Sequence, residues 1–170
     1  HNRAYSLNGK LDDFRVFNHP VTQSDATSLY KELNATTELQ LPKIQQVKSG
    51  DLQTFLITED NELWGFGKNA KGQLGDGTNK DSFIPKKLTD MKVKDLTVGN
   101  QHIIFVNEDD NVYGSGDNKF GQLGLATRNA INVFTKLNPV GPLGIAAGSQ
   151  HSLILDKDGT VLVAGRNTDG

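Results

Sequence analysis

The 170-residue sequence predicts an all-β fold that contains part of a β-propeller. Three observations lead to this prediction: a 49-residue internal repeat, a glycine excess confined to that repeat, and short β-rich runs joined by tight turns. Of the 18 glycines, 17 lie between Gly50 and Gly170. Four short antiparallel strands in a repeat of this length are typical of a propeller blade.

Thirteen glycines recur at five positions of the repeat, and we interpret them as structural residues of the blades. Residues 50–75 and 99–124 are identical at 10 of 26 positions without a gap, and residues 99–121 and 148–170 at 8 of 23. Unrelated segments would share roughly 1 or 2 residues by composition alone, so the repeat is real. The recurring glycines are Gly50, Gly99 and Gly148; Gly67, Gly116 and Gly165; Gly72, Gly121 and Gly170; Gly65 and Gly114; and Gly75 and Gly124.

Residues 1–40 precede the repeat and have a different pattern. Alternating apolar residues predict one strand over Lys10–Phe17. Thr22 is a suitable N-cap for a following helix, whose apolar residues keep helical spacing as far as Leu33. One strand and one helix bury too little surface to fold alone, so we expect this segment to be the end of another domain.

Each repeat is expected to hold a hairpin, a glycine-rich loop and two further strands. The hairpin tips are EDN, EDD and KDG, three-residue connections of the kind that join antiparallel strands. The glycine-rich loops are KNAKGQLGDG and DNKFGQLGLA, and the further strands are FIPKKL, VKDLTV, NVFTKL and GIAA. The expected hairpin strands are residues 52–58 and 62–67, 102–107 and 111–116, and 151–156 and 160–165.

These patterns divide the chain into an N-terminal piece, a linker and three repeats, the last of them truncated. The chain holds two whole repeats and about half of a third, so it is too short to close a propeller ring by itself. We expect the parent chain to continue past Gly170, or other copies to complete the structure. The segments are residues 1–34, 35–43, 44–92, 93–141 and 142–170.

Composition narrows the classes of function. The chain has a formal net charge of −2, 35% hydrophobic residues and no cysteine. Near-neutral charge without a basic stripe argues against a nucleic-acid surface. The lack of cysteine excludes a disulfide scaffold, and no apolar run approaches the ~20 residues of a membrane span.

The repeats resemble those of the regulator of chromosome condensation family. The resemblance rests on a small-Gly pair, a His position, a hairpin of the form DG-V-W-WG and an N–GQLG loop, in the same order in three units over about residues 44–170. It implies a seven-bladed β-propeller, and seven blades of this length would need roughly 340 residues. Gln53 replaces the usual His, and Val163 replaces the glycine found at Gly65 and Gly114.

The segment before the linker resembles the C-terminal end of laminin-G-like, concanavalin-type jelly-roll domains. The residues concerned are GKLDDFRVFNHPVTQSDATSLY, in which a final strand with paired acids precedes a short helix or turn. This resemblance implies a β-sandwich of carbohydrate- or protein-binding type before the propeller.

Two motifs imitate ligand loops. The glycine spacing of a P-loop occurs twice, but Gln73 and Gln122 stand where the phosphate-binding lysine is required. Asp156 and Asp158 resemble the start of a calcium loop, whose twelfth position requires a bidentate Glu and here holds Asn167. We interpret all three segments as blade turns.

His102 and His151 occupy one position of the repeat. A metal or general-base role needs convergent partners, and the sequence shows no cysteine or regular glutamate beside them. We interpret them as structural histidines. No catalytic, cofactor-binding or metal-binding residue is predicted, and no cofactor.

We therefore predict a non-enzymatic binding or structural module that displays variable loops on a rigid propeller. Candidate partner contacts are Asn69, Lys71, Lys119 and Phe120, at or beside the loop tips Ala70–Lys71 and Lys119–Phe120, which differ between repeats. The predicted partner is a protein or a cell-surface glycan, or other copies or chains of a larger assembly. The predicted setting is a multidomain surface, secreted or virion protein, such as an adhesin or a phage fibre or decoration component. The alternative is a regulatory propeller, such as a guanine-nucleotide exchange factor for a small GTPase.

Overall fold

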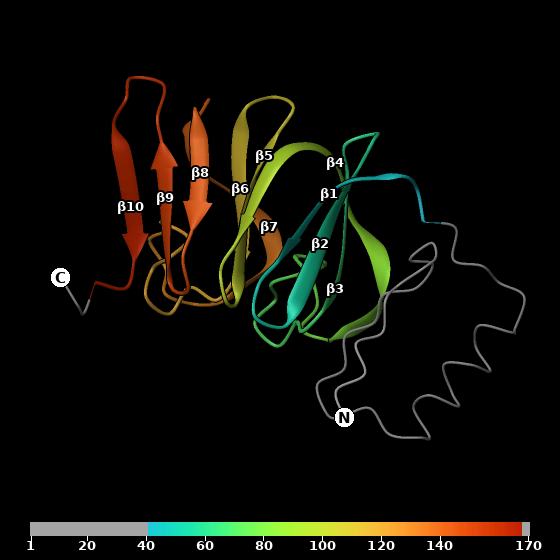
Figure 1. Cartoon of the computed structure of the whole chain (residues 1–170). Coiled ribbons are helices and arrows are strands. Elements are labelled where there is room, and N and C mark those ends of the chain that lie inside the picture. Colours follow the sequence, from blue (N-terminus) through green and yellow to red (C-terminus); the bar gives the residue numbers. More distant parts are fainter. Residues whose placement is uncertain (1–40, 168–170) are drawn as a thin grey trace, which may run out of the picture.

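The computed structural model describes residues 41–167, apart from the side chains of residues 139–140, and every regular element in this part is a β-strand (Figure 1). The predicted all-β fold and partial propeller are confirmed. The strand predicted over Lys10–Phe17, the helix after Thr22 and the recurring Gly170 lie outside the described residues.

Ten strands form three consecutive antiparallel blades. Within each blade, neighbours in sequence are hydrogen-bonded neighbours in the sheet, which is the meander expected of a propeller blade. The strands are β1(Ile44–Ser49), β2(Gln53–Thr58), β3(Glu62–Gly67), β4(Ser82–Val98), β5(His102–Asn107), β6(Asn111–Gly116), β7(Ile131–Val140), β8(Gly144–Ala147), β9(His151–Leu155) and β10(Val161–Gly165).

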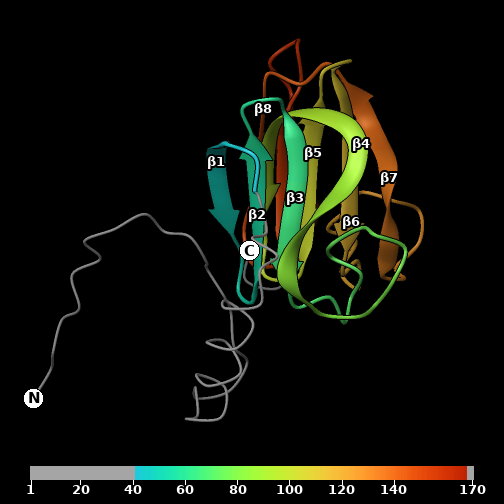
Figure 2. The ribbon, with the colours of Figure 1, turned by 90° about the vertical axis from the view of Figure 1, so that its right-hand side faces the viewer.

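Strand β4 has 17 residues and belongs to two blades. Its first part pairs with β3 as far as Lys92, and its second part pairs with β5 from Val93 onward. Figure 2 shows β4 as a long curved ribbon that passes from β3 to β5. Blade 1 is therefore β1, β2, β3 and the first part of β4; blade 2 is the second part of β4 with β5, β6 and β7; blade 3 is β8, β9 and β10.

The three hairpin tips have the same backbone. Asn61 and Asp110 have φ values of 60°, and Gly159 has a φ of 87°. These residues occupy one position of the 49-residue repeat. Asn, Asp and Gly are the residues that tolerate this left-handed conformation, so the sequence of each tip suits its turn.

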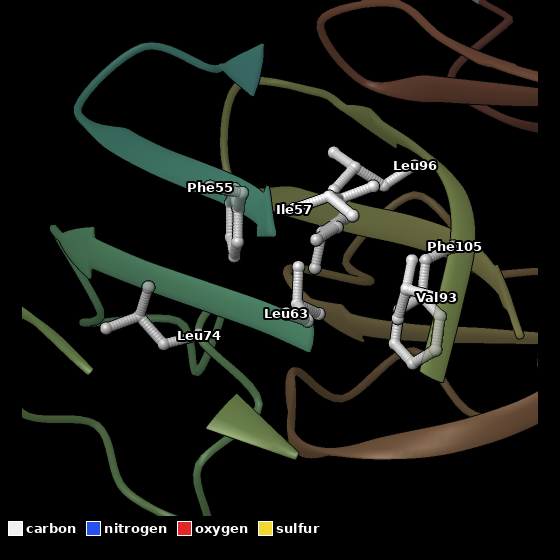
Figure 3. Packing of buried hydrophobic residues seen from close by; sticks show 8 residues of the cluster. Phe55, Ile57, Leu63, Leu74, Val93, Leu96 and Phe105 are labelled. Carbon is white, nitrogen blue, oxygen red and sulfur yellow. The ribbon is translucent and has the colours of Figure 1, made fainter. Parts of the chain in front are cut away.

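The core lies between the blades and not within any one of them. We call each interface between neighbouring blades a seam. In the seam between blades 1 and 2, side chains of the two facing sheets interdigitate (Figure 3). Burying each of these side chains contributes about 1.5–3 kcal/mol. The buried members are Phe55, Ile57, Leu63, Leu74, Val93, Leu96, Ile103 and Phe105.

Strand β5 contributes side chains to two seams, the first between blades 1 and 2 and the second between blades 2 and 3. Ile103 and Phe105 face blade 1, whereas Ile104 packs with Ile154 of blade 3. Successive side chains of a strand point to opposite faces, so a strand between two neighbours is apolar at consecutive positions. This is why HIIFVN reads as an unbroken apolar run. The second seam also contains Val112, Leu123 and Leu137.

The seams explain one recurring glycine position. A Cβ at Gly114 would collide with Leu123 and Leu137, the leucines that fill the second seam. Gly65 stands equally close to side chains of its own blade. Blade 3 has Val163 at this position, and its side chain is 68% exposed.

At a second recurring position, that of Gly116, the backbone conformation itself requires glycine. Gly116 has a φ of 105°, and a Cβ there would collide with the carbonyl oxygen of Gln101. We expect Gly116→Val to lower the free energy of unfolding by about 2–4 kcal/mol, from backbone strain and overpacking. Chemical denaturation measures this.

Gly144→Val is the matched control, because Gly144 lies in a strand and nothing would approach its Cβ within 4 Å. This variant is expected to stay within about 0.5 kcal/mol of the wild type. Equal stability of the two variants would contradict the structural role of Gly116.

Candidate binding surface at the loop end

The blades have two ends of different construction. At one end lie the hairpin tips, residues 59–61, 108–110 and 156–160, and we call it the hairpin end. At the other end lie the long loops of residues 68–81 and 117–130, and we call it the loop end. In Figure 1 the tips of β5–β6 and β9–β10 lie at the top and the long loops at the bottom.

Asn69 organises the first long loop from inside. Its side chain is 0% exposed, and its Nδ2 donates to Asp76 Oδ1 and to the carbonyl oxygens of Thr78 and Lys80, each at 3.1 Å. Its Oδ1 accepts from the backbone N–H of Leu74 at 2.9 Å. A group buried and bonded in this way is not available to a partner. Asn69 was predicted as a partner contact, and the structure places it in the loop's interior instead.

The second loop repeats this construction. Asn118 is also 0% exposed, and its Oδ1 accepts from the backbone N–H of Leu123 at 2.9 Å. The glutamines of both GQLG motifs are buried, and their Oε1 atoms accept from the backbone N–H groups of Lys71 (2.9 Å) and Phe120 (3.0 Å). The N–GQLG motif therefore specifies the fold of the loop and holds its tip.

The first loop docks on the next blade. The backbone N–H of Gly77 donates to the carbonyl of Asn132 at 2.7 Å. In return Asn132 Nδ2 donates to the carbonyl of Gly77 at 3.1 Å and to Asn79 Oδ1 at 2.9 Å. The first loop is thus fixed from inside by Asn69 and from outside by Asn132.

The other three predicted contact residues all lie at the loop end, in two different loops. Lys71 and Lys119 are exposed, and Phe120 is half-buried. The Lys119 ammonium lies 5.7 Å from the centroid of the Phe120 ring, and the Arg166 guanidinium of blade 3 lies 5.6 Å from it. Both distances are within the range of a cation–π contact.

Arg166 was missed by sequence reasoning, and a signal for it was present. It follows the second hairpin strand of blade 3, at the position that Lys68 and Asp117 occupy in blades 1 and 2. A charged residue that changes sign between repeats marks a surface position whose role differs from blade to blade. In blade 2, Asp117 Oδ2 accepts from Gln122 Nε2 at 3.0 Å.

A line of polar contacts crosses the seams at the same repeat position. Gln53 Nε2 donates to the carbonyl oxygens of Gly99 (3.1 Å) and Asn100 (2.8 Å) in the next blade. His102 Nε2 and Ser152 Oγ form a hydrogen bond of 2.9 Å across the second seam. Gln53 is therefore a working replacement for histidine, because each side chain reaches forward to the following blade.

Burial lowers the pKa of His102 from 6.5 to about 4. The negative charge of Asp117 opposes this shift, and the positive charge of His151 adds to it. The His102 side chain is 0% exposed, so its imidazole is neutral at pH 7.

In residues 41–167, no three histidine, cysteine, aspartate or glutamate side chains lie close enough together to hold a metal ion. The same part of the chain has no helix of the length and apolarity needed to cross a membrane.

Comparison with known families supports the repeat. Residues 60–106 match the Regulator of chromosome condensation (RCC1) repeat, and residues 93–122 and 144–170 match a second description of the same repeat. A 46-residue stretch, 27% of this chain, is 37% identical to the ultraviolet-B receptor UVR8 of Arabidopsis thaliana and covers 10% of that protein.

Solved structures agree on the fold. Human WBSCR16 superposes with a TM-score of 0.67 at 22% identity, over 79% of this chain and 37% of that one. Prp20p from Saccharomyces cerevisiae superposes with a TM-score of 0.66 at 24% identity, over 76% of this chain and 34% of that one. The chain thus spans about a third of each solved chain.

The buried imidazole makes stability depend on pH. The pKa of His102 is lower in the folded state, about 4, than the ordinary 6.5 of the unfolded state, so its contribution is complete above pH 6.5 and is lost as the pH falls toward 4. The loss reaches about 3 kcal/mol. We expect His102→Gln to remove this part of the pH dependence, since glutamine already serves at Gln53.

The measurement is the free energy of unfolding of wild type and variant across this pH range. At pH 7 the two proteins are expected to agree within about 1 kcal/mol. If the wild type and the variant lose stability in parallel between pH 6.5 and 4, His102 is not the responsible group.

Proposed function

This chain carries RCC1 repeats in a partial β-propeller, and from that premise we propose that it is a non-enzymatic protein-binding scaffold that presents its loop end to a partner. The observation that carries the proposal is a division of labour within each loop. The residues that fold the loop are buried and recur, whereas the two residues at the tip are largely exposed and differ between blades.

The comparison of the two loops makes this concrete. Asn69 and Gln73 recur as Asn118 and Gln122, and all four side chains are buried. Between them the exposed pair Ala70–Lys71 is replaced by Lys119–Phe120. Loops that vary on a rigid frame are the usual carriers of recognition.

The polar residues that would attract an enzymatic interpretation have structural tasks. His102 bridges two blades and is neutral at pH 7. The glutamines of the GQLG loops hold backbone N–H groups, and Asn61 and Asp110 form the hairpin tips. This distribution supports a role in binding, and we propose no reaction for the chain.

Similar propellers bind proteins. Prp20p is a protein whose binding to Gsp1p and histones has been characterised, and it forms a complex with Kap60. This supports a protein as the partner of the present chain. It also supports the second candidate function, a regulatory propeller such as an exchange factor for a small GTPase.

The glycan partner and the surface, secreted or virion setting stay predictions. They depend on the laminin-G-like resemblance of residues 1–34, which lie outside the described part of the chain.

The proposal predicts that partner capture depends on the loop end. We expect a variant with Lys71→Glu, Lys119→Glu and Phe120→Ala to fold with little change in stability, because the two lysines are exposed and Phe120 is only half-buried. The immobilised full chain would be exposed to an extract of its source organism, and proteins captured by the wild type but not by the variant would be identified by mass spectrometry.

Lys43→Glu with Lys157→Glu is the matched control, since it reverses two charges at the hairpin end. It is expected to capture the same proteins as the wild type. Capture that is unaffected by the loop-end changes would overturn the proposal.

The regulatory alternative has its own measurement. Release of a fluorescent guanine nucleotide from purified small GTPases is followed with and without the full chain. Under the scaffold proposal the release rate stays unchanged. An acceleration of about tenfold or more, equivalent to at least 1.4 kcal/mol in the barrier, would establish the exchange-factor role instead.

A further inference from the structure

The two ends of the blades carry opposite charge, although the whole chain is near neutral. Within the described residues the loop end has seven basic and four acidic side chains, and the hairpin end has nine acidic and five basic ones. At the loop end these are Lys48, Lys68, Lys71, Lys80, Lys119, Arg128 and Arg166 against Asp51, Asp76, Asp81 and Asp117. At the hairpin end they are Glu59, Asp60, Glu62, Asp90, Glu108, Asp109, Asp110, Asp156 and Asp158 against Lys43, Lys87, Lys92, Lys94 and Lys157.

Pairing of the charges also differs between the two ends. At the hairpin end most lysines have a carboxylate partner: Lys43 pairs with Glu59 at 3.6 Å, and Lys94 pairs with Asp110 at 2.7 Å. At the loop end, Lys71, Lys119 and Arg128 are exposed and have no carboxylate of residues 41–167 within ion-pair distance. At these three side chains the loop end therefore presents positive charge that no carboxylate of residues 41–167 neutralises.

Two of these cations lie over one aromatic ring, and a third lies against the same loop. Lys119 and Arg166 both lie over Phe120. Arg128 lies against the next residue of the loop, since a Cβ on Gly121 would come within 3.3 Å of its Nη1. The group Lys119, Phe120, Arg128 and Arg166 unites two blades, and we call it the cationic clamp.

Blade 1 shows two of these repeat positions in the presence of the outer strand of the next blade, because β7 lies beside its loop. Both positions are exposed there. Lys71 and Asn79 are the counterparts of Phe120 and Arg128, and both are exposed although β7 of the next blade contacts their loop. Exposure at the repeat positions of Phe120 and Arg128 is therefore not limited to blade 2, whereas Arg166 is exposed where its counterparts Lys68 and Asp117 are half-buried.

We propose that the cationic clamp binds a carboxylate-rich segment of a protein partner; this inference rests on the proposed function and names the chemistry of the partner. The Arg128 guanidinium offers bidentate donors that match a carboxylate, and Lys119 adds a second exposed cation. Arg166, whose Nη1 donates to Gln150 Oε1 at 3.0 Å, adds positive charge beside them. The apolar edge of Phe120 provides contact area for a side chain between the acids.

The same observations disfavour a nucleic acid. A phosphate backbone needs an extended basic track, whereas the loop end interleaves four carboxylates with its cations. Base stacking needs a free aromatic face, and the ring of Phe120 already has cations over it. A short acidic peptide meets neither obstacle.

The test uses the full chain and a fluorescein-labelled glutamate-rich peptide in an anisotropy titration. The comparison peptide has glutamine at every glutamate, and labelled oligothymidylate is the nucleic-acid probe. We expect the glutamate peptide to bind about tenfold more tightly than the glutamine peptide, and the difference to shrink as salt is raised. Equal binding of the two peptides, or tighter binding of oligothymidylate, would overturn the proposal.

Variants locate the binding surface. Lys119→Glu with Arg128→Glu is expected to weaken binding of the glutamate peptide about tenfold or more, equivalent to 1.4 kcal/mol. Lys119→Gln with Arg128→Gln, which removes charge without reversing it, is expected to be intermediate. Lys43→Glu with Lys157→Glu at the hairpin end is expected to bind as the wild type does. Thermal unfolding of each variant confirms that it is folded, and equal loss at the two ends would overturn the proposed location.

Competition separates this inference from the proposed function. If a protein captured through the loop end is released by excess glutamate peptide, both stand. If capture requires the loop end but the glutamate peptide does not compete, the scaffold function stands and the carboxylate chemistry is wrong. If no capture depends on the loop end, the proposed function itself fails.

Discussion

The seam between blades is the constraint on which the rest of this structure depends. No blade has an apolar core of its own; Phe55 and Phe105 are both fully buried because blade 1 and blade 2 face one another. Stability of such a chain is the sum of contacts between neighbours, as in other repeat proteins. The polar contacts at Gln53 and His102 join successive blades, and Gly114 leaves room for the leucines of the second seam.

Because the seams hold the blades, the loop tips are free to differ. Asn69 and Asn118 complete their loops with internal hydrogen bonds, so Lys71 and Phe120 are not needed to maintain the fold. Chemical variety can then accumulate at the tips at little cost in stability. The separation of structural and exposed positions within one short motif connects the fold of this chain to its proposed binding role.

The sequence was sufficient to predict the blades, but it was not sufficient to predict which residues form the surface at the loop end. Glycine recurrence and tips such as EDN predicted the hairpins, because turns are determined by local residues. Asn69 was misjudged because it stands next to the variable tip, although its recurrence as Asn118 indicated a structural residue, which its 0% exposure shows. The near-zero net charge of the whole chain concealed the difference in charge between the hairpin end and the loop end. Which end a residue lies at depends on the direction of its strand, and this required the structure. Arg166 and Phe120 lie 46 positions apart in sequence, so their contact required the tertiary structure.

Strand β4 adds a kinetic consequence to this architecture. Its first part is the outer strand of blade 1 and its second part the inner strand of blade 2, with continuous strand structure from Ser82 to Val98. Unravelling blade 1 through β4 would leave the inner edge of blade 2 without its anchor. Local opening, as recorded by amide hydrogen exchange, should therefore extend over two blades together, and the cooperative unit of this chain would be larger than the repeat that built it.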